Sequence, residues 1–140
     1  MQLDKVQPKN KSQLKQLINY AFKHNIYDLN FIDTSEITDM SLLFSNRMHN
    51  FDVSSWDVSN VTNMGYIFYH CKNFNCDLSN WDVSKVKNMN YMFYNCKNFN
   101  CNLSDWDISN MTRWKNIFCG CDKITIPNWY KKLYIVKNKI

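Results

Sequence analysis

Apolar residues recur along the chain at a spacing of 25 positions. Trp56, Trp81 and Trp106 are each followed by Asp-Val-Ser or Asp-Ile-Ser. Two further apolar columns keep step with the tryptophans: Met64 and Met89, then Phe68, Phe93 and Phe118. Repeats of fixed length stack so that neighbours bury a shared core. The pattern predicts a repeat solenoid with all three columns inside, the tryptophans serving as core and not as a ligand platform.

The spacing inside one repeat predicts two short elements. The apolar positions of 78–86 approximate the pattern of a leucine-rich repeat, in which a short strand borders the shared core. The apolar positions of 89–96 recur at i, i+3, i+4 and i+7, which is typical of one face of a helix. We therefore expect an α/β fold made of coils of about 25 residues, each with a short strand, a turn, a short helix and a return loop.

Helical patterns also lie at both ends of the chain. An apolar stripe after Ser12, a candidate N-cap, predicts a helix over 12–24. Pro127 can open a second helix over 127–137, with Tyr130, Leu133 and Ile135 or Val136 facing the last coil. Since the end coils of a stack need covering, both helices are expected to act as caps. The expected domain is therefore single, with a cap over 1–27, about four coils over 28–126 and a capping helix over 127–140.

Two motifs of the repeat resemble a known family. They are N-x-x-x-M-F-x-x-C at 88–96 and F-N-x-x-L-S-x-W-D-V-S-x-V at 74–86. Together with the upstream helix they resemble the BspA-like leucine-rich repeats, also called DUF285 repeats, over residues 12–126. Members occur in bacterial surface proteins and, as tryptophan repeats, in some large DNA viruses. The resemblance implies a leucine-rich-repeat stack and, from some surface members, adhesion or host-protein binding.

Catalytic chemistry is not expected from this composition. The chain has only two glycines, which argues against a glycine-rich phosphate loop. His24, His49 and His70 belong to no recurring partner set, and no Ser or Cys lies in a recognisable catalytic motif. We therefore expect no enzyme, no catalytic residues, no cofactor and no metal site, and a function in binding or scaffolding.

A polar row accompanies the tryptophan column. Asp57, Asp82 and Asp107 each lie between two inward positions, so strand alternation points their side chains outward. The rest of the expected face is polar too: Ser59, Ser84 and Ser109, then Ser55, Asn80 and Asp105. The carboxylates could serve the structure by bonding turn amides, or could bind a ligand. Our leading hypothesis is a face that binds a basic or polar region of another protein.

Four of the six cysteines have spacing close to that of a zinc site. Cys71, Cys76, Cys96 and Cys101 read as C-x4-C-x19-C-x4-C. The spacing also follows from the repeat, and Cys76 and Cys101 share a column with Phe51. Buried free thiols are favoured, since free Cys packs as a small hydrophobe. Zinc binding and disulfides remain open.

Charge is divided unevenly along the chain. Residues 1–27 carry five basic and one acidic side chain, 28–109 carry five and ten, and 110–140 carry seven and one. The alternative function is therefore contact of the basic ends with nucleic acid or an anionic membrane, through Lys131, Lys132, Lys137 and Lys139 beside Trp129 and Tyr134. We regard a protein partner as the better hypothesis, and expect a monomer. No leader or membrane span is evident in the sequence, which favours the cytoplasm, with a surface location as the alternative if a leader was removed.

Overall fold

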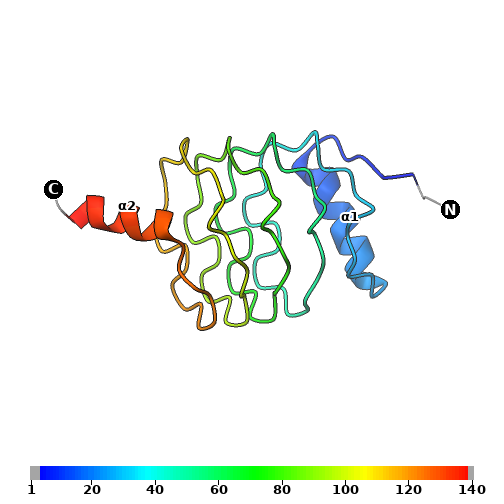
Figure 1. Cartoon of the computed structure of the whole chain (residues 1–140). Helices are drawn as coiled ribbons and strands as arrows, with labels where there is room; N and C mark the ends of the chain where they lie inside the picture. Colours follow the sequence, from blue (N-terminus) through cyan, green and yellow to red (C-terminus); the bar gives the residue numbers. More distant parts are fainter. Residues whose placement is uncertain (1–3, 139–140) are drawn as a thin grey trace.

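The computed structural model describes residues 4–138 and has one helix near each end of the chain. Helix α1 spans Lys11–Lys23 and helix α2 spans Asn128–Asn138. Between them the chain makes successive turns that lie side by side (Figure 1). We divide these turns into four units that follow the repeat of the sequence: residues 28–49, 50–74, 75–99 and 100–126.

Side chains from equivalent positions of neighbouring units meet in the core. The ring of Phe68 is stacked between those of Phe44 and Phe93, with centroid distances of 5.8 and 5.5 Å. The three expected columns are buried along with them: Trp56, Trp81, Trp106, Met64, Met89, Phe68, Phe93 and Phe118. Burial of this much aromatic surface is the main favourable term that holds the units together.

The expected strand of each unit is absent. Within residues 4–138 the chain contains only isolated parallel bridges, such as Asn63 to Asn88 and Asn88 to Arg113. The backbone of the third unit bends between bridges instead, because the amides of Trp81 and Val86 bond the oxygens three residues before them. A backbone that turns every few residues cannot form a continuous strand ladder.

The expected helix over 89–96 is also absent, although its apolar face is buried. Residues 90–95 form consecutive turns, in which Tyr91 and Asn95 have φ of 55° and 58°. The backbone amides of Met89 and Phe93 donate to the next unit, to the oxygens of Arg113 and Ile117 at 2.8 and 3.0 Å. In a helix the amide of Phe93 would instead donate to the oxygen of Met89 within the segment. Hydrogen bonding between units therefore replaces the helix.

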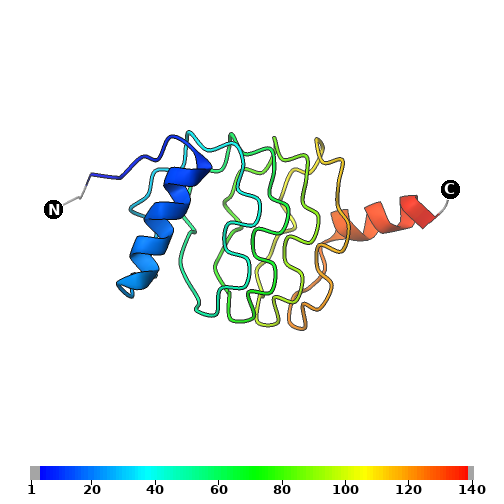
Figure 2. The same ribbon diagram turned by 180° about the vertical axis from the view of Figure 1, so that it is seen from behind.

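The N-terminal end of the stack is covered. Asn10, rather than Ser12, caps α1, and its side chain accepts a hydrogen bond from the amide of Gln13 at 2.9 Å. Helix α1 buries Leu14, Ile18 and Ala21 against the first unit, and Figure 2 shows it lying across that end.

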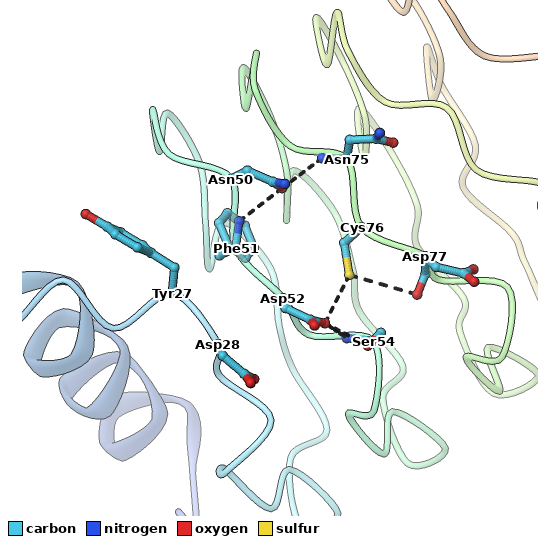
Figure 3. Close-up of a pocket in the computed structure, with 9 residues that line it drawn as sticks. All are labelled: Tyr27, Asp28, Asn50, Phe51, Asp52, Ser54, Asn75, Cys76 and Asp77. Carbon is cyan, nitrogen blue, oxygen red and sulfur yellow. Dashed lines mark hydrogen bonds between the residues drawn. The ribbon is translucent and has the colours of Figure 1, made fainter.

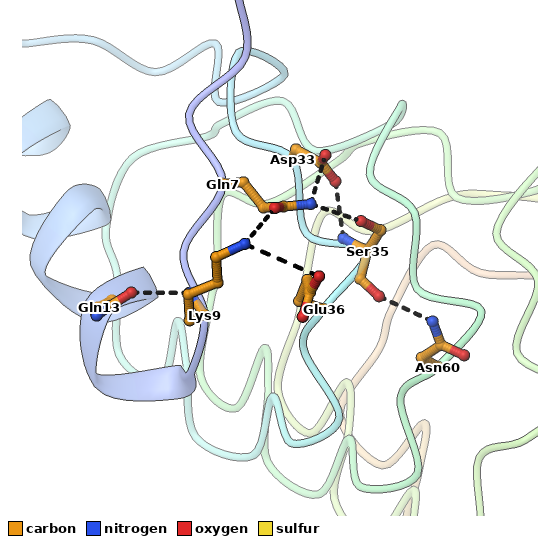
Figure 4. A network of polar contacts seen from close by, with 7 residues as sticks. All are labelled: Gln7, Lys9, Gln13, Asp33, Ser35, Glu36 and Asn60. Carbon is orange, nitrogen blue, oxygen red and sulfur yellow. Dashed lines mark hydrogen bonds and ion pairs between the residues drawn. The ribbon is translucent and has the colours of Figure 1, made fainter.

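An extended segment before α1 extends this cover. Val6 forms a parallel bridge with Ile32 in the first unit. Beside the bridge, the side chain of Gln7 donates to Asp33 and Ser35, while Lys9 contacts Glu36 (Figure 4). The chain thus supplies its own cover at this end, with both backbone and side-chain bonds.

The C-terminal helix does not close the stack in the expected way. Trp129, Tyr130 and Leu133 are half-buried against the last unit. Ile135 and Val136 are 50% and 61% exposed, and the helix projects away from the stack (Figure 1). The expectation that one of these two faces the last coil was therefore wrong, because only the first turns of α2 reach the core. Neither helix in residues 4–138 is long and apolar enough to cross a membrane.

Candidate binding surfaces

The expected aspartate row lies on the surface. Asp57, Asp82 and Asp107 are exposed. Each accepts a hydrogen bond through Oδ1 from the amide of the serine two residues later, at 3.0 Å. The remaining residues of this face are exposed or half-buried: Ser55, Ser59, Asn80, Ser84, Asp105 and Ser109. The row therefore has the structural role that the sequence left open, and it still presents carboxylates to solvent.

Hydrogen bonds lower the pKa of Asp82 and Asp107 in this row. Bonds from the side chain and backbone of Ser84 hold the pKa of Asp82 below its ordinary value. The equivalent bonds from Ser109 lower the pKa of Asp107. Asp107 in turn opposes the ionisation of Asp82, because like charges on neighbouring units repel. The hydrogen bonds prevail, so both groups are negative at neutral pH.

A groove runs beside this row across the units. Its first hollow, of about 420 Å³, is lined by Tyr27 and by residues from the start of the first three units, shown in Figure 3: Asp28, Asn50, Phe51, Asp52, Ser54, Asn75, Cys76 and Asp77. The next hollow shares Asn75, Cys76 and Asp77 and adds Asn100, Cys101 and Asn102. A third continues from there to Pro127 and Lys131. The shared residues place these hollows next to one another along the stack, and we call this row of hollows the groove.

Exposed carboxylates recur along the groove. Asp52 accepts hydrogen bonds from the backbone and hydroxyl of Ser54 at 2.9 and 2.7 Å, and Asp77 accepts the same pair from Ser79. These bonds lower the pKa of both carboxyl groups. Asn102 occupies the equivalent place in the fourth unit and accepts the same two bonds from its serine. The turn therefore needs a side-chain oxygen at this position, but it does not need the negative charge of aspartate.

Cysteine thiols line the groove between the carboxylates. The Cys76 thiol lies 3.6 Å from Oδ1 of Asp52, and the Cys101 thiol lies 3.5 Å from Oδ1 of Asp77. Both cysteines are buried in the wall. Burial, together with Asp52 and Asp77, raises the pKa of Cys76 to about 12. The thiols are therefore neutral donors to the carboxylates at physiological pH.

A second cysteine column lies inside the core. The thiols of Cys71, Cys96 and Cys121 each donate to a phenylalanine carbonyl of the preceding unit at 2.9 Å. All six cysteines are free, and Cys119 alone is exposed. Burial raises the pKa of Cys71 to about 12 and raises that of Cys96 further. No three His, Cys, Asp or Glu side chains within residues 4–138 come together in a way that could hold a metal ion.

The sequence prediction placed binding on the aspartate row and overlooked the groove. The two surfaces share one signal, an acidic or amide residue followed two positions later by serine, as in Asp52-Val-Ser and Asp57-Val-Ser. That signal marks a turn in both cases. Whether such a turn borders a hollow depends on the height of the surrounding surface, and that height is set only when the units stack.

Trp129 differs from its predicted role. The sequence placed it beside the lysines of the last helix as a possible contact for nucleic acid or membrane. Its indole Nε1 instead donates to the backbone oxygen of Leu103 at 2.8 Å, as Trp106 does to Leu78 at 3.0 Å. Trp129 therefore continues the tryptophan column at a shorter spacing. Lys131, Lys132 and Lys137 are exposed, and Lys139 lies outside the described residues.

Comparison with known proteins identifies the family. The family model described as "Mycoplasma protein of unknown function, DUF285" matches residues 12–129, which is most of the chain. No curated protein and no solved structure matches the chain. The match starts just inside α1 and ends in α2, so it includes all four units, most of α1 and Trp129 of α2. The chain belongs to the DUF285 family.

Proposed function

We propose that the chain is a leucine-rich-repeat-like solenoid that serves as a non-catalytic protein-binding module. Its groove binds a basic, extended segment of a partner protein that lies across successive units. The observation that carries the proposal is the row of adjacent hollows that forms the groove, in which Asp28, Asp52 and Asp77 recur from unit to unit. Extended concave surfaces of stacked repeats commonly bind other macromolecules in this way.

Charge complementarity supports a basic occupant. Asp52 and Asp77 are held ionised by their serine partners, and no lysine or arginine forms an ion pair with either of them among residues 4–138. A lysine or arginine side chain of a partner would supply the missing charge. The carboxylates are already fixed by the turns, so binding would require little ordering of these side chains.

The predicted aspartate row adjoins the groove and extends its acidic surface. A hollow of about 460 Å³ is lined by Ser54 and Asp77 from the groove and by Ser55, Trp56 and Asn80 from the region of the row. A segment in the groove could therefore reach Asp57 and Asp82 with long side chains. We propose that the row contributes to the edge of the same interface, where charge affects the association rate more than the affinity.

Binding of a labelled peptide tests the groove. The probe is a fluorescein-labelled 12-residue peptide of alternating lysine and glycine, measured by fluorescence anisotropy with the full chain. In the variant Asp52→Asn/Asp77→Asn we expect the affinity to fall about tenfold, because two charge-assisted contacts are lost. Asparagine preserves the turn, as Asn102 shows.

The matched control is Asp4→Asn/Asp122→Asn, which changes the net charge equally at exposed positions outside both surfaces. It should bind the peptide within about twofold of the unaltered chain. Equal losses in the two variants would show that only overall charge matters and would refute the groove as the site. A third variant, Asp57→Asn/Asp82→Asn/Asp107→Asn, changes only the row and therefore measures the contribution of the row to binding separately from that of the groove.

The exposed outer part of α2 favours a second candidate function, binding to an anionic membrane surface. Ile135 and Val136 are exposed beside Lys131, Lys132 and Lys137 on this projecting helix. Basic and apolar groups on one exposed helix are typical of interfacial binding. Co-sedimentation with phosphatidylserine vesicles, but not with phosphatidylcholine vesicles, would support this candidate. Equal or absent binding to both would remove it.

A further inference from the structure

Four rows of backbone hydrogen bonds connect neighbouring units through residues 89–96 and the equivalent segments of the other units. In the third unit the amides of Met89, Tyr91, Phe93 and Asn95 donate to the oxygens of Arg113, Lys115, Ile117 and Cys119, at 2.8 to 3.0 Å. The first and second units donate to the next unit through the equivalent four amides. Every second amide thus points along the stack, toward its C-terminal end.

The fourth unit has no following unit to receive these bonds. Its equivalent amides belong to Trp114, Asn116, Phe118 and Gly120, and we call them the C-terminal edge. Within residues 4–138 none of the four has a hydrogen-bond acceptor. The chain instead leaves this unit through α2, whose Trp129 and Tyr130 rings contact the ring of Phe118, and the rest of the helix projects away (Figure 1). Unpaired amides in a row form a ready template for another segment.

The opposite end of the stack shows how such an end is covered. There an extended segment adds to the first unit, with hydrogen bonds from the amide of Val6 to Phe31 and from the amide of Asp33 to Val6, at 3.0 and 2.8 Å. Helix α1 lies over the same end. Within residues 4–138 no extended segment covers the C-terminal edge in the same way. The apolar side chains of Ile108, Trp114 and Ile124 at this end are only partly buried.

Charge at the C-terminal edge favours an acidic occupant. The aligned peptide groups place their positive N–H ends there, as in a backbone site that binds anions. Arg113 and Lys115 alternate with two of the edge residues, and both side chains are exposed. Over residues 110–138 the chain carries six basic side chains and one acidic side chain. Backbone and side chains therefore present the same sign of charge.

We propose that the C-terminal edge binds an acidic segment of a partner protein, which adds to the stack as one further turn. Its backbone oxygens accept hydrogen bonds from the four edge amides, and its carboxylates face Arg113 and Lys115. This site is separate from the acidic groove and takes a partner of opposite charge.

A second copy of the chain fits this edge poorly. Two copies that meet edge to edge would oppose donors with donors, because all four amides point the same way. The acceptor end of another copy is covered by α1 and the extended segment. The occupant must instead be a segment with free backbone oxygens.

The test is an ¹⁵N NMR titration of the full chain with a 12-residue peptide of alternating glutamate and glycine. Glycine lets the peptide adopt the positive φ found in the turns of the edge. We expect the largest amide shift changes at Trp114, Asn116, Phe118 and Gly120. Slower hydrogen exchange of these amides in the complex should accompany the changes.

Charge reversal supplies the matched comparison. Arg113→Glu/Lys115→Glu should weaken binding about tenfold, while Lys72→Glu/Lys87→Glu makes the same charge change on inner units and should stay within about twofold. The proposal is overturned if the four amides do not respond, if the two variants lose affinity equally, or if the lysine–glycine peptide binds at the same amides. Concentration-dependent protection of the edge in the free protein would also overturn it, since a second copy would then be the occupant.

Discussion

The indole Nε1 of Trp81 lies 3.1 Å from the backbone oxygen of Val53 in the preceding unit, to which it donates a hydrogen bond. Trp106 makes the same bond to Leu78 at 3.0 Å. Each tryptophan thus fills the core with its ring and satisfies a buried polar atom with its N–H. This combination links neighbouring units more specifically than apolar packing alone.

Substitution of Trp81 should separate these two contributions. Trp81→Ala is expected to lower the free energy of unfolding by about 3–5 kcal/mol, because it leaves a cavity in the core. Trp81→Phe keeps most of the ring packing and should cost about 1 kcal/mol for the lost hydrogen bond. Urea denaturation measures both. Tyr20→Ala, at a position 62% exposed, is the control and should change stability by less than about 0.5 kcal/mol.

Trp129 should determine whether α2 stays attached. Trp129→Ala removes the hydrogen bond to Leu103 and the stacked contact with Trp106, whose ring centroid lies 6.5 Å away. We expect a loss of about 1–3 kcal/mol and faster hydrogen exchange across α2. Ile135→Ala changes an exposed residue of the same helix and should leave exchange at Trp129 and Tyr130 unchanged. If both variants behave alike, Trp129 does not anchor the helix.

Gly120 occupies a position that other residues tolerate poorly. Its φ is 79°, and a Cβ atom there would overlap the side-chain oxygen of Asn95. Gly120→Ala should therefore destabilise the protein by about 1–3 kcal/mol. The control is Gly65→Ala, where φ is not positive and the Cβ would lie 2.9 Å from the side-chain nitrogen of Asn88. The thermal unfolding midpoint should fall further for Gly120→Ala, and the opposite order would contradict the turn geometry.

The buried thiols predict a loss of stability in alkali. Burial raises the pKa of Cys71 and Cys121 to about 12 from an ordinary value of 9.0. The unfolded chain then releases protons that the folded chain retains, so stability is complete below pH 9 and falls as pH rises toward 12. Unfolding free energies measured between pH 7 and 10.5 should show this decline. Cys96→Ala, which also removes a raised pKa, should make the decline shallower.

Carboxylates in the turns predict the opposite dependence in acid. The pKa of Asp77 is lowered by the side chain and backbone of Ser79, so its contribution is present above an ordinary value of 3.8 and is lost as pH falls through the folded-state pKa. Asp77→Asn keeps the turn and should weaken the dependence of stability on pH below 4. Its urea midpoint at pH 7 should fall only slightly, because asparagine retains the acceptor oxygen of the turn and loses only the charge assistance of the two hydrogen bonds. A large fall at pH 7 would mean that the charge itself holds the turn.

The sequence predicted much of the fold from side-chain chemistry. The period of 25, the apolar columns and the two terminal helices are properties of residue order, and the family motif was readable at 74–96. Burial follows from them because an apolar side chain that recurs at one place in every unit meets its own equivalents. The outward position of Asp57 and Asp82 followed from the same alternation.

Tertiary structure alone decided how the backbone is used. The apolar spacing of 89–96 fits a helix as well as it fits the observed turns. The chain forms turns because the amides of Met89 and Phe93 bond oxygens more than twenty residues away. The groove, the place of Trp129 and the open C-terminal edge depend likewise on neighbouring units. Apolar periodicity records which side chains are buried, whereas the hydrogen-bond partners of the backbone are set only when distant parts of the chain meet.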